Sequence, residues 1–258
     1  DKAYDILYRA AWNYPHRSAA MFELANIDCK NKDYNAALIM LDESINLNAG
    51  HTKAHNLKTA ILRKLDSESA VESAKAGVND DKLDLFAMIE YSHFADNKEE
   101  TEQFLSKPEN LLDCARDYMK AGFYDDALYA LDLFTGSSPL INYYKAFITS
   151  DKSYIKKAEK EEMGYCFPSN IEDIQVLKYA IDEDDTAANA RYYLGCLFYD
   201  RFRFDEAAKC FEECVLINPS HARAWRNLSL YYFDKLKMGE KALNCMENAL
   251  KFCPTDPR

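Results

Sequence analysis

Glycine and proline are scarce in this chain of 258 residues, which contains seven of each. Together they make up about 5% of the chain, against about 12% in average proteins. An all-β sandwich or barrel needs many tight turns, and those turns depend largely on these two residue types. The scarcity therefore disfavours such folds and favours long helices joined by short loops. Long apolar runs are also missing, and none approaches the roughly 18 residues of a membrane-spanning helix.

Positive charge is scarce as well. Lys and Arg number 32 against 43 Asp and Glu, so the formal net charge is −11. No run of Lys or Arg is longer than two residues. Because a negative surface repels phosphate backbones, neither nucleic acid nor a membrane is expected as a partner. Apolar residues make up 48% of the chain, which is typical of a packed core rather than of disorder.

Signatures of catalysis and of metal binding are missing too. The chain has no phosphate-binding loop, no dinucleotide glycine motif, no nucleophile elbow and no zinc-protease motif. Its eight cysteines form no C-x-x-C pair, and most fall on apolar helix faces, where a thiol acts as a small hydrophobe. We therefore expect no enzyme activity, no cofactor and no metal. Free thiols also indicate a reducing compartment, so a cytoplasmic location is expected.

A repeat is visible near the C-terminus. Residues 188–219 and 224–254 share a leucine, then a small residue, then aromatic residues, and later an alanine, a bulky residue, a small residue and a closing proline. The corresponding residues are Leu194, Gly195, Phe198, Ala207, Phe211, Cys214 and Pro219 in the first segment, and Leu228, Ser229, Tyr232, Ala242, Met246, Ala249 and Pro254 in the second. The small residues predict that two helices of one unit approach closely, while proline ends the second helix.

This pattern resembles the tetratricopeptide repeat, a helix–turn–helix unit of 34 residues. Weaker units are recognisable upstream, with clearly shortened spacing between residues 80 and 108. The resemblance implies an all-α fold, a right-handed α-solenoid of about sixteen helices. Residues 1–168 are expected to form an N-terminal block that begins in mid-repeat, and residues 183–258 are expected to form the C-terminal units. Neither end has a polar capping unit, so self-association through the ends is an open alternative.

Residues 169–182 are expected to form a solitary linking helix between the two blocks. Ser169 and Glu172 have the spacing of a capping box, in which the hydroxyl and the carboxylate bond the free backbone amides of the first turn. The last third of the chain also resembles the C-terminal repeats of a little-studied bacterial family, in which a β-sandwich domain thought to be sugar-related precedes the repeats. The sandwich is absent here, so that resemblance supplies no catalytic residues.

The expected function is a non-catalytic scaffold for protein–protein interaction. In tetratricopeptide arrays the first helix of each unit lines a concave groove, and the resemblance places five candidate residues there: Tyr192, Tyr199, Arg223, Arg226 and Phe233. Aromatic and arginine side chains are favoured at binding hot spots, although aromatic stripes of this kind also serve as core. The expected ligand is a protein, a peptide or another domain of the same chain. The alternative is an accessory repeat half of a larger carbohydrate-acting enzyme.

Overall fold

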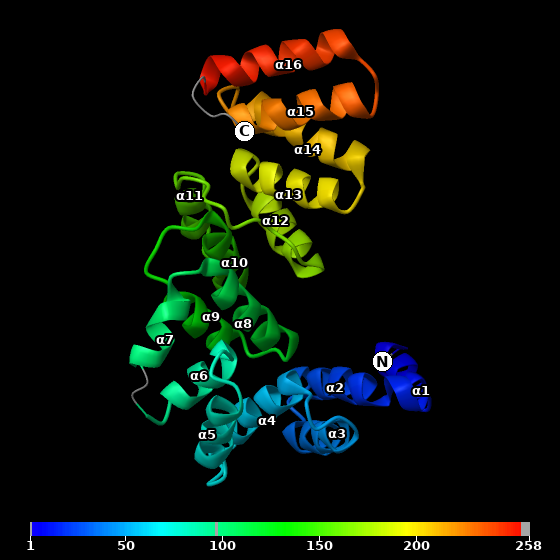
Figure 1. Ribbon diagram of the computed structural model, residues 1–258, viewed down its shortest axis with the longest axis vertical. Coiled ribbons are helices and arrows are strands. Elements are labelled where there is room, and N and C mark those ends of the chain that lie inside the picture. Colours follow the sequence, from blue (N-terminus) through cyan, green and yellow to red (C-terminus); the bar gives the residue numbers. More distant parts are fainter. Residues whose placement is uncertain (1, 96–97, 254–258) are drawn as a thin grey trace. The chain divides into compact units, whose positions relative to one another are not determined.

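The computed structural model describes residues 2–95 and 98–253, and all the regular structure in these ranges is helical. It contains sixteen helices (Figure 1). Their bounds are α1 Lys2–Ala10, α2 Tyr14–Lys30, α3 Tyr34–Leu47, α4 Thr52–Lys64, α5 Ala70–Asp80, α6 Leu85–Ser92, α7 Lys98–Leu105, α8 Pro108–Lys120, α9 Tyr124–Asp132, α10 Pro139–Thr149, α11 Ser153–Ala158, α12 Ile171–Glu183, α13 Ala188–Asp200, α14 Phe204–Ile217, α15 Ala222–Asp234 and α16 Gly239–Phe252. The predicted all-α fold is confirmed. None of the described helices is long and apolar enough to cross a membrane.

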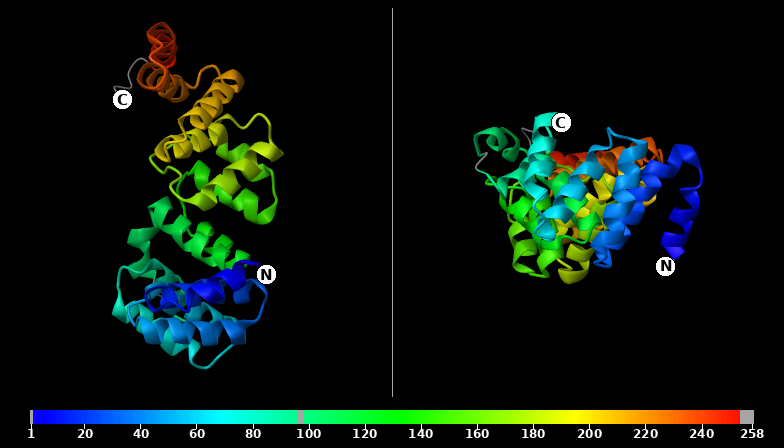
Figure 2. Two further views of the ribbon diagram at one scale, coloured as in Figure 1. Left: turned by 90° about the vertical axis from the view of Figure 1, so that its right-hand side faces the viewer. Right: turned by 90° about the horizontal axis from the view of Figure 1, so that it is seen from below.

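The chain divides into two compact units, Asp1–Gly136 and Ser137–Arg258. The first contains α1 to α9 and the second contains α10 to α16. The division lies between α9 and α10, so the expected limits at residues 168 and 182 both fall inside the second unit. Within each unit, helices that follow one another in the chain pack together, as expected of an α-solenoid. The pairs α2–α3 and α15–α16 are seen in Figure 1 and, from other sides, in Figure 2.

Short polar residues and proline set where many helices begin. The carboxylates of Asp33 and Asp84 accept hydrogen bonds from backbone amides in the first turns of α3 and α6. Proline occupies the first turn of α2, α8 and α10, where its missing N–H is not needed. The helices in the region of shortened spacing are indeed short, since α6 and α7 have eight residues each.

The contact between Gly195 and Phe211 sets the distance between α13 and α14. A Cβ atom at Gly195 would lie 2.6 Å from the Phe211 ring, which is fully buried. Only glycine therefore allows the two helices to approach this closely with a phenylalanine between them. In the following pair the corresponding residue is Ser229, and its hydroxyl donates a 2.8 Å hydrogen bond to the carbonyl of Ala242. The predicted use of small residues for close helix packing is confirmed at this contact.

The linking helix begins two residues later than expected. Its first turn is bonded by Asp173, whose carboxylate accepts hydrogen bonds from the backbone amides of Ser169 and Asn170 at 2.8 and 2.9 Å. The expected Ser169–Glu172 capping box is therefore wrong by one position, and the box is formed by Asn170 and Asp173. The reason is burial, because Asp173 is fully buried and cannot be left without partners. The helix itself, α12, packs against both α10 and α13.

We predict opposite effects for two glycine-to-alanine substitutions in the second unit. Gly195→Ala places a methyl group against Phe211 and should lower the free energy of unfolding by about 1–3 kcal/mol. Gly239→Ala, at the start of α16, meets no atom within 4 Å and should raise it by up to about 1 kcal/mol. Urea unfolding followed by circular dichroism measures both. Equal effects of the two substitutions would contradict the close-packing argument.

Candidate functional site

One concave site of the first unit is a groove between α4, α6, α7 and α8, which we call the acidic groove. It has a volume of about 740 Å³. Four carboxylates line it, from Asp81, Asp84, Asp113 and Asp117, against the two ammonium groups of Lys53 and Lys107. Apolar side chains also line it, namely Leu83, Leu85, Phe86 and Phe104. A groove with charged walls and apolar patches is suited to a polypeptide segment.

Hydrogen bonds across the acidic groove join its walls. The Lys53 ammonium of α4 donates to the Asp117 carboxylate of α8 at 2.7 Å. The Asn56 amide, also on α4, donates at 2.7 Å to Asp84, which precedes α6. Burial raises the pKa of Asp117, although the nearby Lys53 ammonium acts in the opposite direction. Burial also raises the pKa of the Cys114 thiol well above its usual value, so this lining cysteine stays protonated and is no nucleophile.

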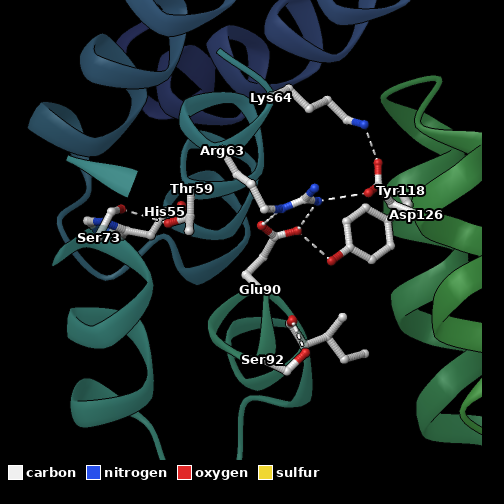
Figure 3. Close-up of polar contacts among 10 residues, drawn as sticks. His55, Thr59, Arg63, Lys64, Ser73, Glu90, Ser92, Tyr118 and Asp126 are labelled. Atoms are coloured by element: carbon white, nitrogen blue, oxygen red, sulfur yellow. Dashed lines mark hydrogen bonds and ion pairs between the residues drawn. The ribbon is translucent and has the colours of Figure 1, made fainter. Parts of the chain in front are cut away.

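A buried ionic network ties together the helices that form the acidic groove (Figure 3). Its centre is Glu90 on α6, whose side chain is fully buried. Arg63 on α4 donates two hydrogen bonds to its carboxylate, from Nε at 2.7 Å and from Nη2 at 2.9 Å. The Tyr118 hydroxyl on α8 donates a third, at 2.6 Å. One carboxylate thus links three of the four groove helices.

A second carboxylate extends this network to α9. Asp126 accepts a hydrogen bond from Nη2 of Arg63 at 2.8 Å and forms an ion pair with Lys64. The two cations lower the pKa of Asp126, in opposition to the effect of burial. Every carboxylate in the network therefore faces at least one cation, as buried charge requires. The network maintains the relative positions of α4, α6 and α8, and with them the shape of the acidic groove.

The acidic groove is lined by one face of α8. Leu112 and Arg116 on that helix are buried, and Arg116 bonds Asp113 at 2.6 Å. The side chains that reach the acidic groove come from Asp113 and Asp117 instead. Their spacing of four residues places them on one face of a helix, and this was the signal in the sequence that could have identified the groove.

The five residues expected to bind a partner do not share one surface. Tyr192 is buried, and Tyr199 is half-buried against Phe204, with ring centroids 5.0 Å apart. Phe233 is 61% exposed near the end of α15. Arg223 and Arg226 are half-buried at the other end of that helix. The Arg223 guanidinium donates a 2.8 Å hydrogen bond to the backbone carbonyl of Met163.

Arg223 and Arg226 line a second, smaller depression, formed by α15 and α16. We call it the α15–α16 face. Its lining residues are Ala222, Arg223, Arg226, Met246, Ala249, Leu250 and Cys253. Of the five predicted residues, these two arginines alone belong to it.

Tyr192 on α13 is covered by His221, the N-cap residue of α15. The His221 ring lies 4.6 Å from the Tyr192 ring, and its Nδ1 accepts a hydrogen bond from the backbone amide of Ala224 at 3.1 Å. His51 makes the same arrangement at the start of α4, where its ring lies 4.9 Å from that of Phe22 and its Nδ1 accepts from Ala54. The histidine is the N-cap residue in both cases.

Cysteine and histidine provide no metal centre in the described ranges. No group of three or more His, Cys, Asp or Glu side chains there is placed to hold an ion. All eight cysteines are free thiols. Cys214 is fully buried in α14, at the small-residue position that the repeat assigns to it.

Comparison with known proteins identifies one repeat. Residues 188–221 match the family model of the tetratricopeptide repeat. The match covers α13, the turn after it and α14, up to the histidine that precedes α15. It confirms the helix–turn–helix unit predicted from Gly195, Ala207 and Pro219.

Among solved structures, the chain is similar to a crystal structure of MamA. The two are 19% identical, and the alignment covers 75% of this chain and 93% of that chain with a TM-score of 0.33. It is also similar to YrrB, described as a tetratricopeptide repeat protein with an unusual peptide-binding site. There the identity is 16%, the coverage is 83% and 93%, and the TM-score is 0.32. Similarity at this level gives no information about a ligand of this chain.

One curated yeast protein matches a short part of the chain. "Essential for maintenance of the cell wall protein 1" of Saccharomyces cerevisiae is 38% identical over 61 residues, which is 23% of this chain and 6% of that protein. The match spans only a small fraction of the yeast protein, so its role is not carried over. The resemblance to a bacterial family with a sugar-related β-sandwich, and the carbohydrate-related alternative, stay predictions.

We predict that Glu90→Gln lowers the free energy of unfolding by about 3 kcal/mol, because it leaves Arg63 with one buried carboxylate partner instead of two. The control is Glu43→Gln, which removes the exposed ion pair of Arg17 and Glu43 and should cost less than about 1 kcal/mol. Chemical unfolding curves measure both. If the two variants lost the same stability, the buried network would not hold the groove helices together.

We also predict a loss of stability in acid that depends on His221. Burial lowers the pKa of this imidazole to about 4, from an ordinary value near 6.5. The unfolded chain therefore binds the proton more readily, and stability falls as the pH drops from about 6.5 through 4. The full difference is about 3 kcal/mol. His221→Asn keeps a capping side chain that does not titrate, so its thermal unfolding should lose less stability between pH 7 and pH 4 than that of the natural chain.

Proposed function

We propose that this protein is a non-catalytic interaction scaffold, and that its acidic groove binds an extended polypeptide segment carrying a lysine or arginine side chain. The observation that carries the proposal is the lining of the groove, where four carboxylates outnumber two ammonium groups beside apolar side chains. Leu83, for example, is 72% exposed at this site. A basic side chain flanked by an apolar one complements both features.

The carboxylates differ in how far they are already neutralised. Asp117 is paired with Lys53, and Asp113 with Arg116. Asp81 and Asp84 instead accept hydrogen bonds from neutral groups, a backbone amide for Asp81 and both a backbone amide and the Asn56 side chain for Asp84. Their charge is thus offset by dipoles, and no cation among the residues that the structure describes is bonded to them. This end of the groove is where a ligand cation gains most.

We expect the groove helices to form a binding site and not a catalytic site. Burial keeps the pKa of the groove thiol of Cys114 high, and His51 and His55 make capping or local contacts. What the groove offers is shape and charge, which are the requirements of recognition. The buried Arg63–Glu90–Tyr118 network supports this role, because a rigid groove loses less conformational entropy when a partner binds.

We predict that random decapeptides displayed on beads and selected with the labelled full chain will be enriched in lysine or arginine next to an apolar residue. A selected peptide should bind at least about tenfold more weakly to the double variant Asp81→Asn with Asp84→Asn, and more weakly at high salt. Fluorescence anisotropy measures the dissociation constant.

The matched control is Asp125→Asn, an exposed carboxylate on α9 that does not line the groove. It should leave the dissociation constant unchanged, and circular dichroism should show equal helicity for all three proteins. Selected peptides without basic residues, or equal affinity for the double variant, would refute the proposal.

A further inference from the structure

The segment that joins α11 to α12 in the second unit follows the length of α13, and we call these residues, 159–170, the strap (Figure 1). At its beginning, the Glu159 carboxylate accepts a hydrogen bond from the backbone amide of Asn189 in the first turn of α13, at 2.9 Å. At its end, the carbonyl of Ser169 accepts a hydrogen bond from Arg201, the residue after α13. The strap is therefore tied to both ends of one helix.

The middle of the strap is extended and rests on the helices below it. Cys166 and Pro168 are buried, whereas Tyr165 is 78% exposed and Phe167 is 39% exposed. Side chains that alternate in this way are typical of an extended segment lying on a surface. The Phe167 ring also contacts the Tyr193 ring of α13, with centroids 5.8 Å apart. The strap thus packs on α13 as an extended peptide ligand packs on its receptor.

The contact of the strap with α15 has a counterpart in the first unit. Arg223 donates a 2.8 Å hydrogen bond to the carbonyl of Met163, in the strap. Arg223 is the second residue after the N-cap His221, just as Lys53 is the second residue after the N-cap His51. Lys53 lines the open acidic groove. At this position of the repeat, the first unit has a groove and the second unit has the strap.

The strap leaves a polar atom of the face unsatisfied. The Tyr193 side chain is fully buried, and its hydroxyl has no hydrogen-bond partner among the described residues. Burial raises the pKa of Tyr193, and the Cys166 thiol of the strap, close by, acts in the same direction. Because a buried hydroxyl without a partner is costly, a segment with a polar side chain at the position of Cys166 fits this face better than the strap itself.

The backbone of the strap is also weakly held. In the part of the chain that the structure describes, residues 162–164 and Phe167 make no backbone–backbone hydrogen bond. Displacement of the strap therefore breaks side-chain contacts and the bond from Arg223 to Met163, and leaves the helices with their own hydrogen bonds.

We propose that the strap is an intramolecular ligand that closes the face of α13 and α15, and that a partner polypeptide displaces it with an extended segment of similar form. This segment places a small polar residue and a proline two positions apart against the helices, as Cys166 and Pro168 lie. Its small residue bonds the Tyr193 hydroxyl, and one of its carbonyls accepts from Arg223. The acidic groove is a separate surface, in the other unit.

The test compares the natural full chain with an opened chain, in which residues 162–167 are replaced by an equal number of glycine and serine residues. The probe is a fluorescent, acetylated and amidated peptide with the sequence of residues 160–170 carrying Cys166→Ser. Anisotropy should show saturable binding to the opened chain. Binding to the natural chain should be at least about tenfold weaker, because the tethered strap competes at an effective concentration of about a millimolar.

A double-mutant cycle tests the bond to Tyr193. A peptide with alanine in place of the serine should bind the opened chain about fivefold more weakly, as expected for one lost hydrogen bond. With Tyr193→Phe in the opened chain, the two peptides should bind equally. Arg223→Gln should also weaken binding, whereas the matched control Arg203→Gln should not, because Arg203 pairs with Glu206 and not with the strap.

Thiol labelling follows displacement in the natural chain. The probe has no thiol, so an excess of it should hold the strap away from α13 and speed the alkylation of Cys166 by iodoacetamide, measured by mass spectrometry. Cys214, which is fully buried in α14, is the internal control and should keep its rate.

Three results would overturn the proposal. Equal affinity of the probe for both chains, or no saturable binding to either, would show that the strap does not close a binding face. Alkylation of Cys166 that the probe does not change would show that the strap is not displaced. A loss of helicity in the opened chain, seen by circular dichroism, would make the strap a permanent part of the fold.

Discussion

The fit of Phe211 against Gly195 sets how closely two consecutive helices approach, and the pairing of helices follows from that distance. A methyl group at Gly195 would meet the Phe211 ring at 2.6 Å. A similar close approach recurs in the first unit, where a Cβ at Gly77 would lie 3.1 Å from Ala87. Because each pair buries one side of both helices, the remaining sides must be covered by neighbouring pairs. Among the described residues, the acidic groove and the α15–α16 face are two places where helix sides remain open.

Tyr192 and Arg226 occupy the same position in consecutive units, but only Tyr192 is buried. His221 closes the ring of Tyr192, and His51 closes the ring of Phe22 in the same way. The two histidine–aromatic pairs lie 170 residues apart in the chain. The motif joins two functions in one residue, since the imidazole caps a helix and covers an aromatic ring of the helix pair before it. Arg226, which occupies the position of Tyr192 in the following unit, is half-buried.

Charge acts in two distinct ways in the first unit. In the interior, Glu90 and Asp126 meet Arg63 and Lys64, and the Tyr118 hydroxyl completes the bonding of Glu90. This arrangement is costly to break, because removing any partner leaves a charge in a poorly solvated place. At the surface, the carboxylates of the acidic groove remain in contact with solvent and can attract a cationic ligand. The internal charges keep the helices in place, while the surface charges select what binds between them.

The sequence alone determined the all-α fold, the close approach of two helices at the small residue Gly195, and the repeat at residues 188–221, because these features depend on residues close together in the chain. That the Phe211 ring fills the space at Gly195 came only from the structure. The sequence did not reveal which side of α8 faces the acidic groove, and it placed the capping box at Ser169 rather than Asn170. Those outcomes depend on burial, which packing between separate helices decides. Glu90, Arg63 and Tyr118 are far apart in the sequence and carry no common motif. Only the tertiary structure brings them together, because a buried carboxylate must find its partners wherever the chain places them.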